Sequence, residues 1–266
     1  MKIKVNHLMK NNKSLMIACD QGLEHGPTDF NLKNIDPNYI LDIALEGRFN
    51  AVILQSGIAE KYYHEAYRDV PLVAKLNGKT NLGRGSPVSK QICSVDRAIK
   101  LGATAVGYTA YPGSANEANN FAEFGKIVEQ AHDYGIPAIL WSYPRGETIR
   151  NDLTTDILAH AARIGLELGA DFIKIKYNHD PEAFKWVVKN AGRARVLTAG
   201  GSKVDSHDFI RSSEEIMKTG ATGIAVGRNI WQADKPFALA HALREIIFRN
   251  KQSSEVLPYL DNEKAN

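Results

Sequence analysis

The stretch Phe172–Tyr177, FIKIKY, places two lysines inside a run of residues that otherwise favours a buried β-strand. Successive side chains of a strand point to opposite faces, so Lys174 and Lys176 are predicted to share one face and Ile173 and Ile175 the other. If the face of the lysines is the interior of the protein, we expect the lysines to carry chemistry, because buried charges are costly.

Seven further runs of this kind occur along the chain, with amphipathic stretches between them. They are SLMIAC (14–19), AVILQ (51–55), PLVAKL (71–76), ATAVGYTA (103–110), PAILWSY (137–143), RVLTAGG (195–201) and TGIAVG (222–227). The stretches 117–135 and 156–169 have apolar residues at helical spacing and end in glycine, as helices often do. Alternating strands and helices predict an α/β fold, and eight such units close most naturally into a (β/α)8 TIM barrel. An open, doubly wound sheet is the alternative, but no Gly-x-Gly-x-x-Gly motif follows the first run.

The composition predicts one large domain. The chain has 266 residues, 44% of them hydrophobic, and we expect residues 1–250 to form the barrel and residues 251–266 a polar C-terminal tail that could be mobile. A net charge of +3 without basic blocks predicts no nucleic-acid or membrane partner. Only two cysteines and no apolar signal segment at the N-terminus predict a cytoplasmic protein.

Polar residues gather at the ends of the predicted strands. In a TIM barrel the active site lies at the C-terminal ends of the strands, so these residues become the candidates for function. Any one of them could be a cap or a surface ion pair, but together on one rim they favour a site. The candidates are Asp20, Gln55, Ser56, Lys75, Asn77, Trp141, Tyr143, Arg145, Lys174, Lys176, Gly200, Gly201, Ser202, Gly227 and Arg228.

The two lysines are the strongest candidates for catalysis. A partly desolvated lysine near another cation has a lowered pKa and is nucleophilic as the free amine, which a Schiff base requires. We expect Lys176 to have this effect on Lys174. On the neighbouring run Tyr143 can transfer a proton, although an aromatic core pair with Trp141 is the commoner arrangement. Asp20 can relay a proton, orient a lysine or simply cap a turn.

Glycines follow the last two strands in AGGSK (199–203) and VGRN (226–229). Barrels often bind a phosphate group at this place through backbone N–H groups, so a phosphorylated small molecule is the predicted substrate, with tight turns as the alternative. The histidines show no His-x-His or HExxH spacing, and we predict neither a metal nor another cofactor.

Six motifs in order closely resemble one known family. They are ACDQGLEHGP (18–27), KLNGKT (75–80), WSYPRG (141–146), GADFIKIKY (169–177), VLTAGGSK (196–203) and GIAVGRNIWQ (223–232). The chain resembles the archaeal-type class I fructose-bisphosphate aldolases of the DhnA/DeoC-like barrel family from the first strand to beyond the eighth. The resemblance implies reversible cleavage of fructose 1,6-bisphosphate to dihydroxyacetone phosphate and glyceraldehyde 3-phosphate, in glycolysis or gluconeogenesis, without a metal and through a lysine Schiff base.

The resemblance also implies a role for each motif residue. Lys174 matches the Schiff-base lysine, Lys176 is an accessory, and Tyr143 matches the proton-transfer residue. Trp141 and Asp20 match positions that shape the pocket and assist proton movement. The implied phosphate-binding positions are Gly200, Gly201, Gly227 and Arg228, and a homo-oligomer, often a decamer, is implied as well.

Other functions stay open. The aminodideoxyheptulosonate synthases and autoinducer-2 thiolases share YPRG and the glycine ends, and Gln21 stands where archaeal aldolases often have histidine. A barrel that binds a sugar phosphate without catalysis is the hypothesis from another class. The intact lysine and tyrosine argue against such a silent barrel, and a cleavage assay would distinguish the two.

Overall fold

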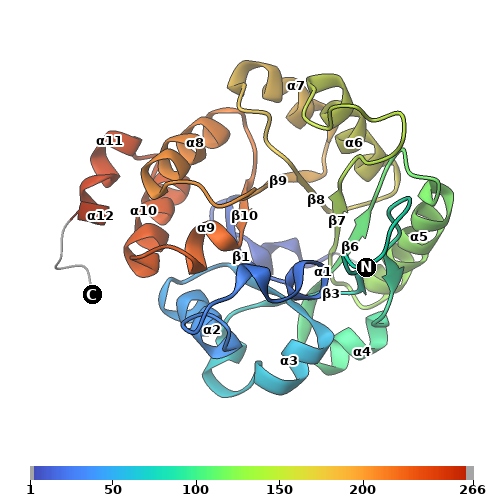
Figure 1. Cartoon of the computed structure of the whole chain (residues 1–266), viewed down its shortest axis with the longest axis horizontal. Helices are drawn as coiled ribbons and strands as arrows, with labels where there is room; N and C mark the ends of the chain where they lie inside the picture. The colour runs from blue at the N-terminus through green and yellow to red at the C-terminus, as the bar shows by residue number, and fades with distance from the viewer. Residues whose placement is uncertain (1–2, 262–266) are drawn as a thin grey trace.

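Eight parallel strands close into a barrel surrounded by helices in the computed structural model, which describes residues 3–261 (Figure 1). The strands are β1 (Ser14–Cys19), β2 (Ala51–Gln55), β3 (Leu72–Lys75), β6 (Ala103–Ala110), β7 (Ala138–Ser142), β8 (Phe172–Ile175), β9 (Arg195–Ala199) and β10 (Gly223–Val226). Around the barrel their order is β1-β10-β9-β8-β7-β6-β3-β2. All eight predicted runs supply these strands, so the TIM barrel is confirmed.

The helices lie outside the barrel (Figure 1). The longer ones are α2 (Pro37–Glu46), α3 (Ser56–Tyr62), α4 (Val95–Lys100), α5 (Glu117–Asp133), α6 (Thr155–Glu167), α7 (Pro181–Asn190), α8 (Ser206–Lys218) and α10 (Pro236–Arg249). Gly135 and Gly169 follow α5 and α6 with φ angles of 69° and 81°, a left-handed conformation that glycine adopts without strain. No helix in residues 3–261 is long and apolar enough to cross a membrane.

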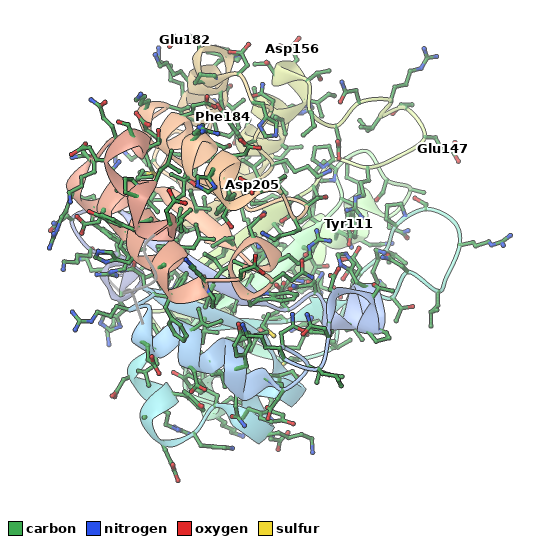
Figure 2. The ribbon with its side chains drawn as sticks, turned by 60° about the vertical axis from the view of Figure 1, so that its left-hand side comes forward. Tyr111, Glu147, Asp156, Glu182, Phe184 and Asp205 are labelled. Carbon is green, nitrogen blue, oxygen red and sulfur yellow. The ribbon has the colours of Figure 1, made fainter. Side chains whose placement is uncertain are left out.

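Two apolar layers hold the barrel together. One fills its interior with inward side chains such as Met16, Ile53 and Phe172, and Leu8 from η1 (Val5–Leu8) packs into the same cluster. The other lies between the strands and the helices, where Phe184 of α7, labelled in Figure 2, is completely buried. Because both faces of each strand are covered, the strand sequences are nearly continuous apolar runs.

Short elements decorate the rim at the C-terminal ends of the strands. These are α1 (Gly22–His25), η2 (Gly26–Asp29), the hairpin of β4 (Asn77–Gly78) and β5 (Lys90–Gln91), and α9 (Arg228–Trp231). The indole N–H of Trp231 donates to the Ala18 carbonyl at 3.0 Å, and its ring stacks on Phe30. These contacts hold the segment after β1 against the segment after β10, which frames one side of the rim.

The C-terminal tail is helical rather than irregular as far as Asp261. It forms α11 (Ser253–Val256) and α12 (Pro258–Asp261), which pack against α10 on the outside of the barrel (Figure 1). Its composition is polar, but Val256 and Leu260 are buried, so these two apolar residues anchor it. The predicted boundary at residue 250 coincides with the end of α10 and stays a prediction, and residues 262–266 of the predicted tail lie outside the described residues.

Candidate active site

A cavity of about 690 Å³ lies at the C-terminal ends of the strands, and all the candidate residues except Ser56 and Asn77 line it. Among the residues that line it are Asp20, Trp141, Tyr143, Arg145, Lys174, Lys176, Gly200, Gly201, Ser202, Gly227 and Arg228. These residues follow or end five different strands, so closure of the barrel brings them together. Lys203, the last residue of the AGGSK motif, is exposed and does not line the cavity.

Two buried lysines lie beside one indole ring at the floor of the cavity. Lys174 of β8 is 6% exposed and Lys75 of β3 is 5% exposed. Their Nζ atoms lie 5.1 Å and 5.5 Å from the centroid of Trp141 on β7. Trp141 fits because β6 carries Gly107 next to it, where a Cβ atom would come within 2.1 Å of the ring. The glycine therefore gives the indole its place between the lysines.

Burial lowers the pKa of Lys174 to about 8, since the interior disfavours the ammonium form. The neighbouring charge of Lys75 lowers the pKa of Lys174 further, and Asp20 opposes both effects. Burial also lowers the pKa of Lys75, against the effect of Asp20, whose Oδ2 lies 4.0 Å from the Lys75 Nζ. A lysine with this pKa has an appreciable fraction of free amine near neutral pH, as a nucleophile requires.

The neighbouring positive charge that lowers the pKa of Lys174 is that of Lys75. The sequence had predicted Lys176 for this effect, and that prediction is corrected. β8 ends at Ile175, and Lys176 follows the strand, with a partly exposed side chain that forms an ion pair with Asp152. The alternation argument assumed that the strand continued through Lys176. Lys176 still lines the cavity, so its predicted part in substrate binding stays a prediction.

Tyr143 lies just past the end of β7, where its partly buried side chain packs against the apolar cluster in the barrel interior. Burial, followed by the charge of Asp20, holds the pKa of Tyr143 well above its ordinary value, so its hydroxyl keeps its proton at neutral pH. Tyr111, labelled in Figure 2, faces the same cavity, and the guanidinium of Arg145 lies 5.2 Å from its ring. Arg145 also lies 3.5 Å from Glu24, which pairs with Lys79.

The glycine loops lie on the other side of the cavity. Gly201 has a φ of 71°, and a Cβ at Gly227 would come within 2.9 Å of the Ala18 carbonyl oxygen. Within residues 3–261 the backbone N–H groups of Gly201 and Ser202 have no protein acceptor. Arg228 reaches over this loop and donates to the Gly201 carbonyl at 3.3 Å. Free N–H groups beside a guanidinium can bind an anionic group.

Asn229 joins the two glycine loops and was not among the predicted residues. It is buried, its amide donates to the carbonyls of Gly200 and Ser202 at 2.6 Å and 2.8 Å, and its carbonyl accepts from the Val204 N–H. The motif VGRN contains this residue, but only the tertiary contacts show its function. Asn77, at the start of β4, acts similarly: its side-chain amide donates to the carbonyls of Ser89 and Thr109 at 2.9 Å and 2.8 Å. Its backbone carbonyl accepts from Lys75 at 3.1 Å.

No three His, Cys, Asp or Glu side chains come together as a metal site would need in the part of the chain that the structure describes. The predictions of no metal and no cofactor stay predictions. The chemistry that the described groups can perform by themselves is nucleophilic attack by an amine, with a protonated phenol and a carboxylate near it.

Comparisons with known proteins agree with this geometry. Residues 14–233 match the model of the DeoC/LacD family of aldolases. The chain is 48% identical to the class 1 fructose-bisphosphate aldolase of Thermoproteus tenax, over 93% of this chain and 94% of that protein. It is 34% identical to a 2-amino-3,7-dideoxy-D-threo-hept-6-ulosonate synthase of Archaeoglobus fulgidus, over 97% and 95% of the two chains.

A solved structure of an archaeal fructose-1,6-bisphosphate aldolase superposes on the barrel with a TM-score of 0.88. The two chains are 47% identical, and the match covers 92% of this chain and 98% of that one. That structure is described as having its catalytic lysine covalently bound to the carbinolamine intermediate of the substrate.

Proposed function

Since the chain belongs to the DeoC/LacD family of aldolases, we propose that it cleaves fructose 1,6-bisphosphate through a Schiff base on Lys174. It is a class I fructose-bisphosphate aldolase, a lyase that produces dihydroxyacetone phosphate and glyceraldehyde 3-phosphate reversibly. The assignment of Lys174 rests on one observation above all: it is a buried lysine with a pKa of about 8 on the floor of the rim cavity.

In the proposed reaction the free amine of Lys174 attacks the C2 ketone of the substrate and forms a carbinolamine. Loss of water gives an iminium ion, and the C3–C4 bond breaks with its electron pair moving toward the iminium nitrogen. The C4 hydroxyl loses its proton as glyceraldehyde 3-phosphate leaves, and the enamine that remains takes a proton at C3. Hydrolysis of the new iminium releases dihydroxyacetone phosphate and restores the amine.

Tyr143 can transfer each proton in this sequence. Its phenol gives a proton to the departing carbinolamine hydroxyl, and the phenolate takes the proton of the C4 hydroxyl. It then gives that proton to C3 and regains one from the attacking water, so the cycle balances. The raised pKa of Tyr143 fits a group that starts as the acid. Asp20 favours positive charge on both lysines, so it stabilises the cationic iminium that forms on Lys174.

The two phosphate groups need binding sites on opposite sides of Lys174. We place one on Gly200, Gly201, Ser202 and the loop of Gly227 and Arg228, where N–H groups and a guanidinium face the cavity. The other belongs on the Arg145 side, with Lys176 nearby on the rim. Anchoring both ends would keep C2 near the amine throughout the reaction.

Borohydride trapping tests the proposal. The protein is treated with dihydroxyacetone phosphate and sodium borohydride, and the adduct is located by mass spectrometry of peptides. We expect one adduct on Lys174, none in Lys174→Met, and an adduct but slow turnover in Tyr143→Phe. An adduct on Lys176 would reverse the choice of nucleophile, and cleavage without any adduct would refute the Schiff base.

Substrate choice and setting complete the proposal. Aminodideoxyheptulosonate synthases share 34% identity, so cleavage of fructose 1,6-bisphosphate should be compared with that of other ketose phosphates in one coupled assay. A barrel that only binds sugar phosphate would cleave none of them. We also place the protein in the cytoplasm, in glycolysis or gluconeogenesis, as a homo-oligomer of ten subunits; light scattering after size exclusion tests the subunit number.

A further inference from the structure

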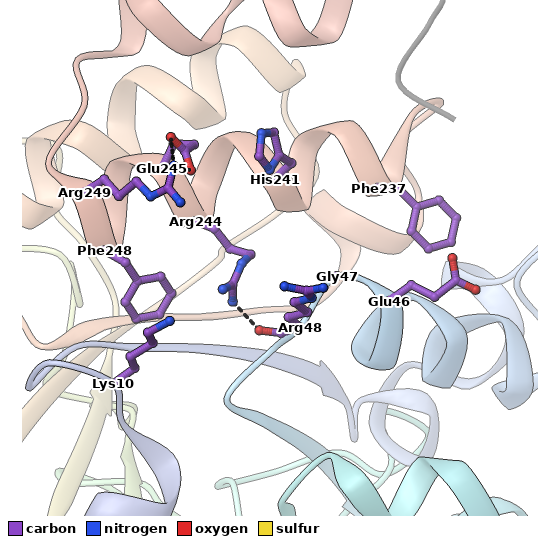
Figure 3. Close-up of a pocket in the computed structure, with 10 residues that line it drawn as sticks. All are labelled: Lys10, Glu46, Gly47, Arg48, Phe237, His241, Arg244, Glu245, Phe248 and Arg249. Atoms are coloured by element: carbon purple, nitrogen blue, oxygen red, sulfur yellow. Dashed lines mark hydrogen bonds and ion pairs between the residues drawn. The ribbon is translucent and has the colours of Figure 1, made fainter.

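A second cavity, of about 250 Å³, lies between α10 and the segments that precede β1 and β2 (Figure 3). Lys10 comes just before β1 and Arg48 just before β2, so both lie at the N-terminal ends of the strands. α10 completes the cavity along its length, from Phe237 in its first turn to Arg249 at its end. We refer to this cavity as the basal pocket.

Three cations of the basal pocket, Lys10, Arg48 and Arg244, come from three separate segments. Figure 3 shows the amino group of Lys10 and the guanidinium groups of Arg48 and Arg244 on the same side of the pocket. Arg244 donates a hydrogen bond to the Arg48 backbone carbonyl, which fixes its position. None of the three side chains forms an ion pair with any residue from 3 to 261.

The acidic residues of the pocket do not balance these charges. Glu245 is buried and already accepts from Arg249 at 3.1 Å and from Lys251 at 2.7 Å. Glu46 lies at the far end of the pocket, beside Phe237 (Figure 3). Lys10 and Arg48 are exposed and Arg244 is half-buried, so the pocket carries an excess of positive charge that Glu245 offsets only in part.

Arg244 is repelled by its arginine neighbours. It is half-buried, and burial together with the charges of Arg48 and Arg249 lowers its pKa, while Glu245 opposes this shift. An anion between the guanidinium groups would remove this unfavourable interaction. Arginine also recognises phosphate oxygens with two parallel hydrogen bonds, and two arginines with a lysine match a dianion.

We propose that the basal pocket binds a small phosphorylated anion through Lys10, Arg48 and Arg244. The volume of about 250 Å³ holds more than a phosphate group alone. Phe237 and Phe248 supply apolar walls for the carbon skeleton that carries the phosphate. The site is separate from the rim, so its occupancy does not depend on the aldolase mechanism.

Amide hydrogen exchange, measured with and without inorganic phosphate, tests whether phosphate binds at this pocket. Exchange is followed in peptides that cover residues 44–50 and 241–250, over a range of phosphate concentrations at constant ionic strength. The pocket variant is Arg48→Asn with Arg244→Gln; asparagine suits the φ of 51° at position 48. The control, Lys189→Gln with Arg193→Gln, removes the same charge from exposed residues at the end of α7 and in the loop after it.

We expect phosphate to protect both peptides in the wild type and the control. The pocket variant should need at least about tenfold more phosphate for half-maximal protection, since charge-assisted hydrogen bonds are lost. Lys10→Gln, an exposed substitution that leaves the packing intact, should weaken protection in the same direction. Absence of protection in the wild type, or equal protection in the pocket variant and the control, overturns the proposal. Protection of peptides from the rim would report binding of phosphate at the active site, so the two sites are distinguished in the same experiment.

Discussion

Trp141 holds two ammonium groups near one ring, and this arrangement sets the chemistry of Lys174. The ring attracts the charged form of each lysine, whereas burial and mutual repulsion disfavour it. The pKa of Lys174 falls to about 8, so burial and repulsion dominate. Lys75 thus acts through Lys174: it lowers the pKa of Lys174 and does not itself react with the substrate.

Replacing Lys75 with methionine should raise the pKa of Lys174, because a nearby positive charge is removed while Asp20 remains. The free amine then appears at higher pH. The rise of kcat/KM with pH should shift upward by about one unit, which is about tenfold less activity on the acidic side of the midpoint. Borohydride trapping at several pH values should show the same shift.

Lys79→Met is the matched control, since Lys79 lines the same cavity but does not affect the pKa of Lys174. Its pH midpoint should equal that of the wild type whatever happens to KM. If Lys75→Met lowers activity equally at all pH values, Lys75 has a structural or binding role instead.

At the scale of elements, β6 and β7 fit together only because β6 has a glycine where the indole lies. In Gly107→Ala the new methyl group would meet two ring atoms of Trp141 at 2.1 Å and 2.2 Å. Overpacking of this kind costs ~1–3 kcal/mol, so we expect a lower thermal midpoint and slower trapping of Lys174 as the ring moves.

The same substitution at Gly125 should have the opposite effect on stability. Gly125 is inside α5, and a Cβ there would meet nothing within 4 Å. Alanine in a helix is favoured over glycine by roughly 0.5–1 kcal/mol, so Gly125→Ala should raise the thermal midpoint without altering activity. Equal stability of the two variants would contradict the packing argument.

The loops after β9 and β10 depend on Asn229 for their relative position. Asn229→Ala removes the hydrogen bonds to Gly200 and Ser202 and leaves their carbonyls without this partner. We expect KM for the bisphosphate to rise at least about fivefold, because loss of a buried partner costs ~1–3 kcal/mol and about 1.4 kcal/mol is tenfold. The pH dependence of trapping at Lys174 should stay unchanged; a shifted pH midpoint would show that Asn229 acts on the lysine instead.

The strands were predictable because each is an apolar run bounded by turn residues, and the rim followed from the rule that a barrel reacts at the C-terminal ends of its strands. The partner of Lys174 was not predictable by alternation, since Lys75 is on β3 and reaches Lys174 only across β6 and β7. Asn229 was missed because its function lies in contacts to another loop. The docking of the polar tail was missed as well, because it depends on the burial of Val256 and Leu260 and on contacts such as that of Lys235 with the Leu260 carbonyl.

The whole molecule bears a cost for its buried lysines. The pKa of Lys174 falls from 10.5 in the unfolded chain to about 8 in the folded one. Because the unfolded state binds the proton more tightly, Lys174 favours unfolding at every pH at which the unfolded chain keeps that proton. Below pH 8 the full cost applies, on the order of 3 kcal/mol at 1.36 kcal/mol per unit. Between pH 8 and 10.5 the cost decreases as the unfolded chain alone keeps the proton.

Lys174→Met should therefore unfold at a higher urea concentration than the wild type at pH 7, although it is inactive. Methionine keeps the unbranched shape and removes the charge, so packing against Trp141 is largely retained. The advantage should shrink as the pH rises from 8 toward 10.5, where wild-type Lys174 is neutral in the native state. Urea midpoints of both proteins at pH 7 and pH 9.5 measure this difference. A variant that is less stable than the wild type at both pH values would mean that the ammonium group of Lys174 has stabilising contacts that outweigh its desolvation.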